Sequence, residues 1–143
     1  CTGNKFSQDE EDLLSKLHIK NKTLQINASD KELSELYTRA SLFVFPSLYE
    51  GFGIPILEAY ACHCPIAISN TSCFPEIAGD AAIYFDPYSV KDIANTIEAV
   101  IYNPQKSNEL IQKGIKRLEL YSWEKTVVET EETYKKTIQG YNF

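Results

Sequence analysis

Short apolar runs alternate with amphipathic helical patterns along the whole sequence of 143 residues. The runs at residues 42–45 and 65–69 are apolar on both faces, which is typical of central strands covered on both sides in a parallel sheet. Shorter strand patterns lie at residues 23–26 and 82–85, and the clearest amphipathic helical face lies at residues 90–101. Strands and helices that alternate over short connections predict an α/β fold with a parallel sheet.

Capping signals mark where several helices begin. Ser7 and Glu10 have the spacing of a capping box, and so do Ser29 and Glu32. Ser122 is predicted to cap the last helix.

Residues 1–143 have the length of a single domain, and the sequence contains no internal boundary or repeat. A doubly wound sheet normally opens with strand-helix units. This chain opens instead with Cys1-Thr2-Gly3, which resembles the end of a strand. We therefore expect that a first strand-helix unit lies upstream.

Charge and hydropathy exclude two classes of partner. The formal net charge is −6 and no basic stripe is present, which argues against a nucleic-acid-binding protein. No apolar run approaches the roughly 20 residues of a membrane-spanning helix, and the N-terminus has no signal-peptide pattern. We expect a cytoplasmic protein, and a peripheral position of the parent enzyme at the inner face of the membrane stays open.

The four cysteines are Cys1, Cys62, Cys64 and Cys73. Their spacing is not that of a secreted disulfide framework, so we interpret them as reduced thiols. Together with His63 the last three could be drawn as a zinc site, but they lack the two separated pairs that such a site uses. We expect small buried side chains here and no metal.

A loop with two glycines follows the strand predicted at residues 42–45. Ligands of open parallel sheets bind beyond the carboxyl ends of the strands. Gly51 and Gly53 permit backbone conformations that other residues resist, and they let a ligand approach the main chain. Pro55 fits the first turn of a helix expected to end near Cys62. The N–H groups at the start of this helix, together with its dipole, would form a phosphate site.

Two glutamates lie on either side of these glycines. Glu58 falls about one turn into the predicted helix, and its two acceptor oxygens suit a ribose diol, as in dinucleotide-binding folds. Glu50 lies next to the expected ligand on the other side. In the plainer interpretation Glu58 stabilises the helix dipole and the glycines are turn residues. The residues alone leave both interpretations open.

The segment FPSLYEGFGIPILE at residues 45–58 resembles the E-x₇-E signature of the large retaining family of GT-B glycosyltransferases, the group 1 or family 4-like enzymes. The resemblance covers nearly the whole chain, in order. It continues through EAYACHCP at 58–65, FPEIAGDAA at 74–82, FDP at 85–87 and Ser122-Trp123. It implies a Rossmann-like parallel sheet with helices on both faces, the C-terminal domain of a GT-B fold.

The resemblance also implies a donor site. Glu50 would be the catalytic residue that contacts the donor sugar, and Glu58 would bind the ribose hydroxyls. Backbone N–H groups for the sugar and diphosphate would come from Gly51, Phe52, Gly53 and Ile54. No metal and no other cofactor is implied, because helix N-termini and basic side chains would stabilise the leaving group.

The chain departs from the family pattern in two ways. His63 stands where the family usually has glycine, and we interpret it as a turn residue in a left-handed conformation. The phosphate-binding Arg and Lys of the family have no match before Phe45, and we expect the acceptor-binding N-terminal domain to lie outside this sequence. We therefore expect this chain to fold but to be catalytically inactive by itself.

The implied enzyme transfers a hexose from a nucleoside diphosphate sugar to an acceptor hydroxyl, in polysaccharide or glycoconjugate biosynthesis. The acceptor glycan or lipid-linked glycan would bind the N-terminal domain. A non-catalytic nucleotide-binding or interaction domain stays an alternative. A Rossmann-type dehydrogenase would need a third glycine in the loop, and a retaining glycosidase would need two carboxyl groups about 5 Å apart.

Overall fold

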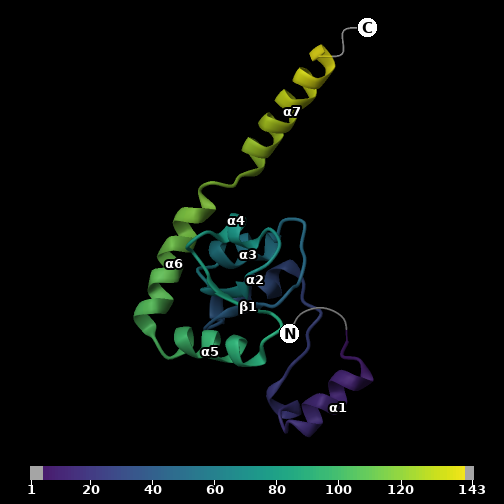
Figure 1. Ribbon diagram of the computed structural model, residues 1–143, viewed down its shortest axis with the longest axis vertical. Helices are drawn as coiled ribbons and strands as arrows, with labels where there is room; N and C mark the ends of the chain where they lie inside the picture. Colours follow the sequence, from purple (N-terminus) through teal and green to yellow (C-terminus); the bar gives the residue numbers. More distant parts are fainter. Residues whose placement is uncertain (1–4, 141–143) are drawn as a thin grey trace. The chain divides into compact units, whose positions relative to one another are not determined.

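Figure 1 shows the computed structural model of the chain, in which residues 5–140 are described. The chain divides into two compact units, Cys1–Leu36 and Tyr37–Phe143, and each is described by itself. The assignment of residues 1–143 to a single domain stays a prediction, and the opening Cys1-Thr2-Gly3 lies outside the described residues.

The first unit contains helix α1 (Gln8–Lys16), the 3₁₀ helix η1 (Lys20–Lys22) and the beginning of α2 (Asp30–Arg39). Both predicted capping boxes are confirmed. The Ser7 N–H donates to Glu10 Oε2 at 2.7 Å, and the Glu10 N–H donates back to Ser7 Oγ at 3.3 Å. At the start of α2 the Ser29 N–H donates to Glu32 Oε2 at 2.9 Å. Each reciprocal pair satisfies backbone N–H groups that the helix leaves without an internal partner.

The strand predicted at residues 23–26 is wrong. Only Ile26 takes part in a bridge, and no strand forms there. The backbone N–H of Thr23 donates to Lys20 O at 3.4 Å, and its hydroxyl donates to Ile19 O at 3.0 Å. The Thr23 backbone N–H is thus used by the preceding 3₁₀ turn, whereas in a strand it could pair with a neighbouring strand. The side chain of Leu24 is 67% exposed, unlike that of a buried strand residue.

The second unit is built on three parallel strands, β1 (Phe43–Phe45), β2 (Ile66–Ser69) and β3 (Ile83–Phe85), in the order β1-β2-β3. The register pairs Phe45 with Ile68 and Ser69 with Phe85. The predicted parallel α/β fold is therefore confirmed. The central position predicted for residues 42–45 is wrong. Strand β2 is central and fully buried, whereas β1 is half-buried at the edge of the described sheet.

The helices described beyond β1 are α3 (Ile54–Ala61), α4 (Phe74–Ala78), α5 (Val90–Ile101), α6 (Pro104–Leu118) and α7 (Trp123–Gly140). Helix α5 packs against β3 and α6, and α6 packs against α3 (Figure 1). The Lys125 N–H donates to Ser122 Oγ at 3.1 Å, so the predicted cap of α7 is confirmed. None of the helices in residues 5–140 combines the length and apolarity needed to cross a bilayer.

Helices α3 and α6 approach closely where Tyr60 of α3 faces Gly114 of α6. Tyr60 is 2% exposed, and burial raises the pKa of its phenol above the usual value. A Cβ built on Gly114 would lie 2.9 Å from Cε1 of the Tyr60 ring and closer still to Cδ1. Because side chains in a close-packed core have little room to retreat, only glycine fits this position of α6.

We expect Gly114→Ala to destabilise the chain by about 2–3 kcal/mol, since the added methyl group must separate α3 from α6 or displace the buried Tyr60 ring. Urea unfolding followed by circular dichroism measures this. Gly140→Ala is the matched control, because nothing lies within 4 Å of a Cβ at that position. Equal unfolding midpoints for the two variants would contradict the interpretation.

Candidate functional site

The glycine loop, residues 46–53, joins β1 to α3 at the carboxyl end of β1. Gly53 caps α3 with a φ of +92°, in the left-handed region that other residues avoid. A Cβ here would lie 3.1 Å from the Phe74 ring and 3.2 Å from Ile56 Cδ1. Gly53 is thus required by conformation and by space. For Gly51 the conformational expectation is wrong, because its φ is not positive, and nothing lies within 4 Å of a Cβ there. The approach of a ligand to its main chain stays a prediction.

Helix α3 begins with backbone N–H groups that point to no protein acceptor. Its cap Gly53 has no side chain, and Pro55 has no N–H to donate. The first N–H of α3 used by the protein is that of Ile56, which donates to Gly53 O at 2.9 Å. Within residues 5–140, the backbone N–H groups without an acceptor include those of Gly51, Phe52, Gly53 and Ile54. These groups can bind the oxygens of an anion.

Glu50 is held in place by both its side chain and its backbone. The Ser47 hydroxyl donates to Glu50 Oε1 at 2.9 Å. The Ser72 hydroxyl donates to Glu50 O at 2.8 Å and accepts from Glu50 N at 3.3 Å. The Cys73 thiol donates to Glu50 O at 3.3 Å and contacts Phe52 O at 3.2 Å. The loop after β2 therefore fixes the glycine loop after β1.

Glu58 lies on α3, one turn beyond the glycines, and is exposed. The Tyr37 hydroxyl donates to Glu58 Oε2 at 3.3 Å. Burial raises the pKa of the Tyr37 phenol, and the Glu58 carboxylate raises it further, so the phenol stays protonated and able to donate. The Tyr37 ring in turn meets the edge of Phe43, with ring centroids 5.1 Å apart. Tyr37 thus orients one oxygen of Glu58.

Phe52 connects the glycine loop to the end of α6. Its ring meets the Tyr121 ring edge-on, with centroids 5.8 Å apart. The Tyr121 hydroxyl donates to Ile77 O at 3.2 Å. The Arg117 side chain donates to Ile77 O at 2.8 Å and to Glu76 O, and its guanidinium carbon lies 6.0 Å from the centre of the Tyr121 ring. Arg117 thereby satisfies carbonyls at the end of α4 and supports the ring behind Phe52.

Sequence reasoning missed Ser72, Cys73 and Tyr37. The first two follow β2, so the rule that ligands lie beyond the carboxyl ends of parallel strands could have pointed to them. No local signal marks Tyr37, because its partner Glu58 is 21 residues away in the chain. The site thus depends on contacts that the motif does not contain.

The Cys-His-Cys segment forms a turn and a buried thiol. His63 has a φ of +57°, which confirms its interpretation as a left-handed turn residue. Cys64 is 1% exposed, and burial raises the pKa of its thiol to about 11. Cys62 and Cys73 are only half-buried, so the expectation of small buried side chains holds for Cys64 alone. Over residues 5–140 no three His, Cys, Asp or Glu residues gather as a metal site would require. Cys1 lies outside that range.

Known proteins similar to this chain are sugar-transferring enzymes. The family model "Glycosyl transferases group 1" matches residues 3–117. The O-antigen chain mannosyltransferase B of Escherichia coli is 38% identical over 106 residues, which are 74% of this chain and 28% of that protein. The MMP alpha-(1->4)-mannosyltransferase of Mycolicibacterium hassiacum is 32% identical over 114 residues, 77% of this chain and 28% of that protein. The chain thus spans just over a quarter of the length of these relatives.

A solved structure has the same architecture. The sucrose-phosphate synthase of Thermosynechococcus elongatus matches with a TM-score of 0.85 and 22% identity, over 97% of this chain and 38% of that one. At this identity the similarity shows the fold alone. It agrees with the parallel sheet and flanking helices described above.

The two glycines of the loop should respond differently to substitution. We expect Gly53→Ala to lower the free energy of unfolding by about 1–2 kcal/mol, because alanine is strained at a left-handed φ and would press on the Phe74 ring. Gly51→Ala is the matched control and should change stability by less than about 0.5 kcal/mol. Urea unfolding of both variants tests this, and a larger loss for Gly51→Ala would refute the assignment.

Proposed function

Because the chain belongs to the group 1 glycosyltransferases, we propose that it is the donor-binding part of a retaining enzyme that transfers a hexose from a nucleoside diphosphate sugar to an acceptor hydroxyl. The transfer would serve polysaccharide or glycoconjugate biosynthesis. The names of the relatives above, both mannosyltransferases, support a hexose as the transferred sugar. The acceptor would be a glycan or lipid-linked glycan.

One observation carries the proposal: a run of N–H groups that have no acceptor within residues 5–140 lies between two oriented glutamates in the sequence. The groups at residues 51–54 precede or begin α3, where the helix dipole adds positive potential. Glu50 lies before this run and Glu58 beyond it. A diphosphate bound at the N–H groups would place a sugar and a ribose on its two sides. This matches the connectivity of a nucleoside diphosphate sugar.

The two glutamates would have different tasks. Glu58 keeps one oxygen near the Tyr37 hydroxyl, and its exposed carboxylate would accept from the ribose hydroxyls. Glu50 is tied to Ser47 and Ser72, so its carboxylate would meet the sugar in a fixed orientation. Groups held in place before the reaction stabilise a transition state without the cost of reorganising.

The leaving nucleoside diphosphate gains negative charge as the bond to the sugar breaks. The N–H groups of the glycine loop and the dipole of α3 would stabilise that charge. We therefore propose transfer without a divalent metal. Nucleotide affinity that is the same with and without EDTA is the expected result.

Glu58→Ala should weaken nucleotide binding roughly tenfold to a hundredfold, because charge-assisted hydrogen bonds contribute about 1.5–3 kcal/mol. Calorimetric titration of the chain with UDP and with GDP measures the loss. Glu76→Ala is the matched control, since Glu76 is exposed in the first turn of α4 and its side chain makes no recorded hydrogen bond within residues 5–140. Equal affinities for the wild type and Glu58→Ala would remove Glu58 from the site.

Glu50→Gln, made in a full-length enzyme that carries this chain, should leave the affinity for nucleoside diphosphate nearly unchanged. It should lower kcat about a hundredfold or more, since a preorganised contact to developing charge contributes about 2.7–4 kcal/mol. Steady-state kinetics paired with nucleotide titration separates the two effects. A loss of nucleotide affinity as large as the loss of turnover would show that the two glutamates do not divide the work in this way.

A further inference from the structure

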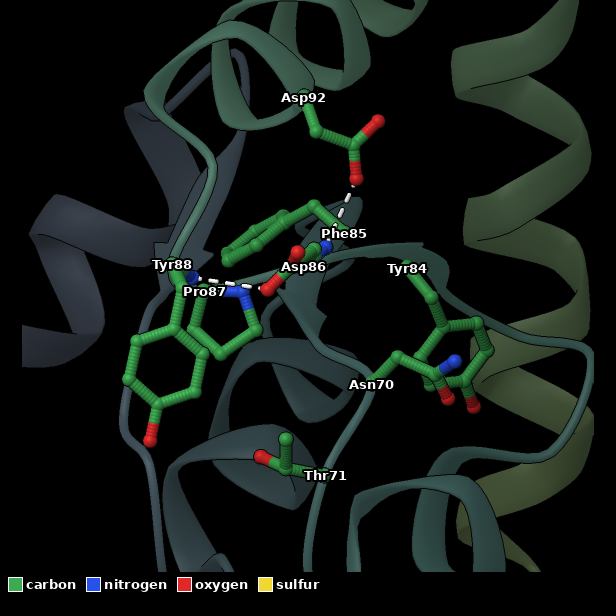
Figure 2. A pocket seen from close by; sticks show the side chains of 8 residues that line it. All are labelled: Asn70, Thr71, Tyr84, Phe85, Asp86, Pro87, Tyr88 and Asp92. Atoms are coloured by element: carbon green, nitrogen blue, oxygen red, sulfur yellow. Dashed lines mark hydrogen bonds between the residues drawn. The ribbon is translucent and has the colours of Figure 1, made fainter.

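A pocket opens at the same edge of the sheet, beyond the carboxyl ends of β2 and β3 (Figure 2). Its volume is about 450 Å³. Asn70 follows β2 directly, Asp86 follows β3 directly, and Asp92 comes from the first turn of α5. None of these residues belongs to the glycine loop.

The lining of this pocket is rich in hydrogen-bond acceptors. It contains two carboxylates, Asp86 and Asp92, and the amide of Asn70, and no lysine, arginine or histidine lines it. A phosphate would meet electrostatic repulsion here, because two carboxyl groups and no basic side chain line the pocket. The pocket therefore suits a ligand that is uncharged and carries several hydroxyl donors.

Backbone contacts hold both carboxylates in position, as the dashed lines in Figure 2 show. The Asp86 N–H donates to Asp92 Oδ2 at 2.7 Å, and the Tyr88 N–H donates to Asp86 Oδ1 at 2.9 Å. The Asp92 N–H donates to Ser89 Oγ at 3.2 Å, which fixes the start of α5. Within residues 5–140 the second oxygen of each carboxylate has no recorded partner. Side chains ordered in advance lose little conformational entropy when a ligand binds.

An apolar surface lies beside these acceptors. Tyr88 is 79% exposed, and Pro87 precedes it at the pocket wall. A pyranose ring has the complementary surface, with hydroxyl donors around its rim and C–H groups on its face. Pockets that combine an aromatic side chain with a few placed polar groups are typical of small-ligand sites.

We propose that this pocket binds a neutral pyranose unit of a glycan, with Asp86 and Asp92 accepting from its hydroxyls and Tyr88 covering its apolar face. The assignment of the glycan as acceptor or product rests on the proposed transferase function. The loop that contributes Asn70 continues to Ser72, which is hydrogen-bonded to the backbone of Glu50. The pocket and the glycine loop therefore share one supporting segment.

Titration of the 143-residue chain with α-linked mannotriose, followed by ¹H–¹⁵N NMR, tests this proposal. We expect weak saturable binding, with chemical-shift changes at Asn70 and at residues 86–88. Tyr88→Ala and Asp86→Asn should each weaken that binding about tenfold or more. Asparagine keeps the acceptor for the Tyr88 N–H, and Tyr88 is exposed, so both variants should stay folded. Inorganic phosphate should cause no change at these residues.

Matched controls are Tyr102→Ala and Asp9→Asn, which change an exposed tyrosine and an exposed aspartate outside the pocket and should leave mannotriose binding unaltered. Absence of saturable binding, or equal affinities for the wild type, Tyr88→Ala and Asp86→Asn, would overturn the proposal. Nucleotide titration of the same samples keeps the two proposals apart. If mannotriose binds in the pocket and nucleotide does not bind, the glycan-site proposal is supported and the donor-site proposal is contradicted. If nucleotide binds and mannotriose does not, the donor-site proposal is supported and the glycan-site proposal is contradicted.

Discussion

The backbone hydrogen bonds between β1, β2 and β3 bring three loops to one edge of the sheet. Parallel pairing in the register Phe45 to Ile68 and Ser69 to Phe85 aligns the carboxyl ends of the strands. Each strand is only three or four residues long, so each loop begins immediately beyond this paired segment. Both the glycine loop and the pocket lined by Asn70, Asp86 and Asp92 depend on that alignment.

The contact between Ser72 and Glu50 turns these neighbouring loops into one assembly. A single hydroxyl donates to the carbonyl of Glu50 and accepts from its N–H. The Cys73 thiol adds contacts to the carbonyls of Glu50 and Phe52. A loop whose backbone groups are paired in this way has fewer conformations available. It therefore loses less conformational entropy when an extended ligand binds.

Much of the fold and the core of the motif could be predicted from the sequence. Period and capping residues act locally, so the α/β order and the capping boxes follow from short segments. The left-handed turn at His63 was predicted from the resemblance to the family, which usually has glycine there. The edge position of β1 could not be predicted, because an apolar run has the same pattern at the centre of a sheet and at its edge. The strand predicted at residues 23–26 is wrong for a related reason: pairing requires a neighbour, and the segment's own pattern does not contain one.

The residues proposed for the site come from the sequence, whereas the side chains that hold them in place were not predicted. The glutamates and the glycine loop form one continuous motif, whereas Tyr37 and Ser72 reach it across 21 and 22 residues. Tertiary packing brings such pairs together, and a single sequence does not show which distant residues will meet. The different roles of Gly51 and Gly53 also become visible only from φ and from the space around each Cα. The functions of Glu50 and Glu58 stay predictions.

The Arg117 side chain has a consequence for how mutational data on this protein would be interpreted. It binds carbonyls at the end of α4 and lies against Tyr121, whose ring contacts Phe52. Lysine cannot replace its planar fork of donors, so even a charge-conserving change would release the ring behind the glycine loop. A mutational screen that measures activity alone would therefore class Arg117 with the ligand-binding residues. In the structure, Arg117 instead contacts the end of α4 and Tyr121.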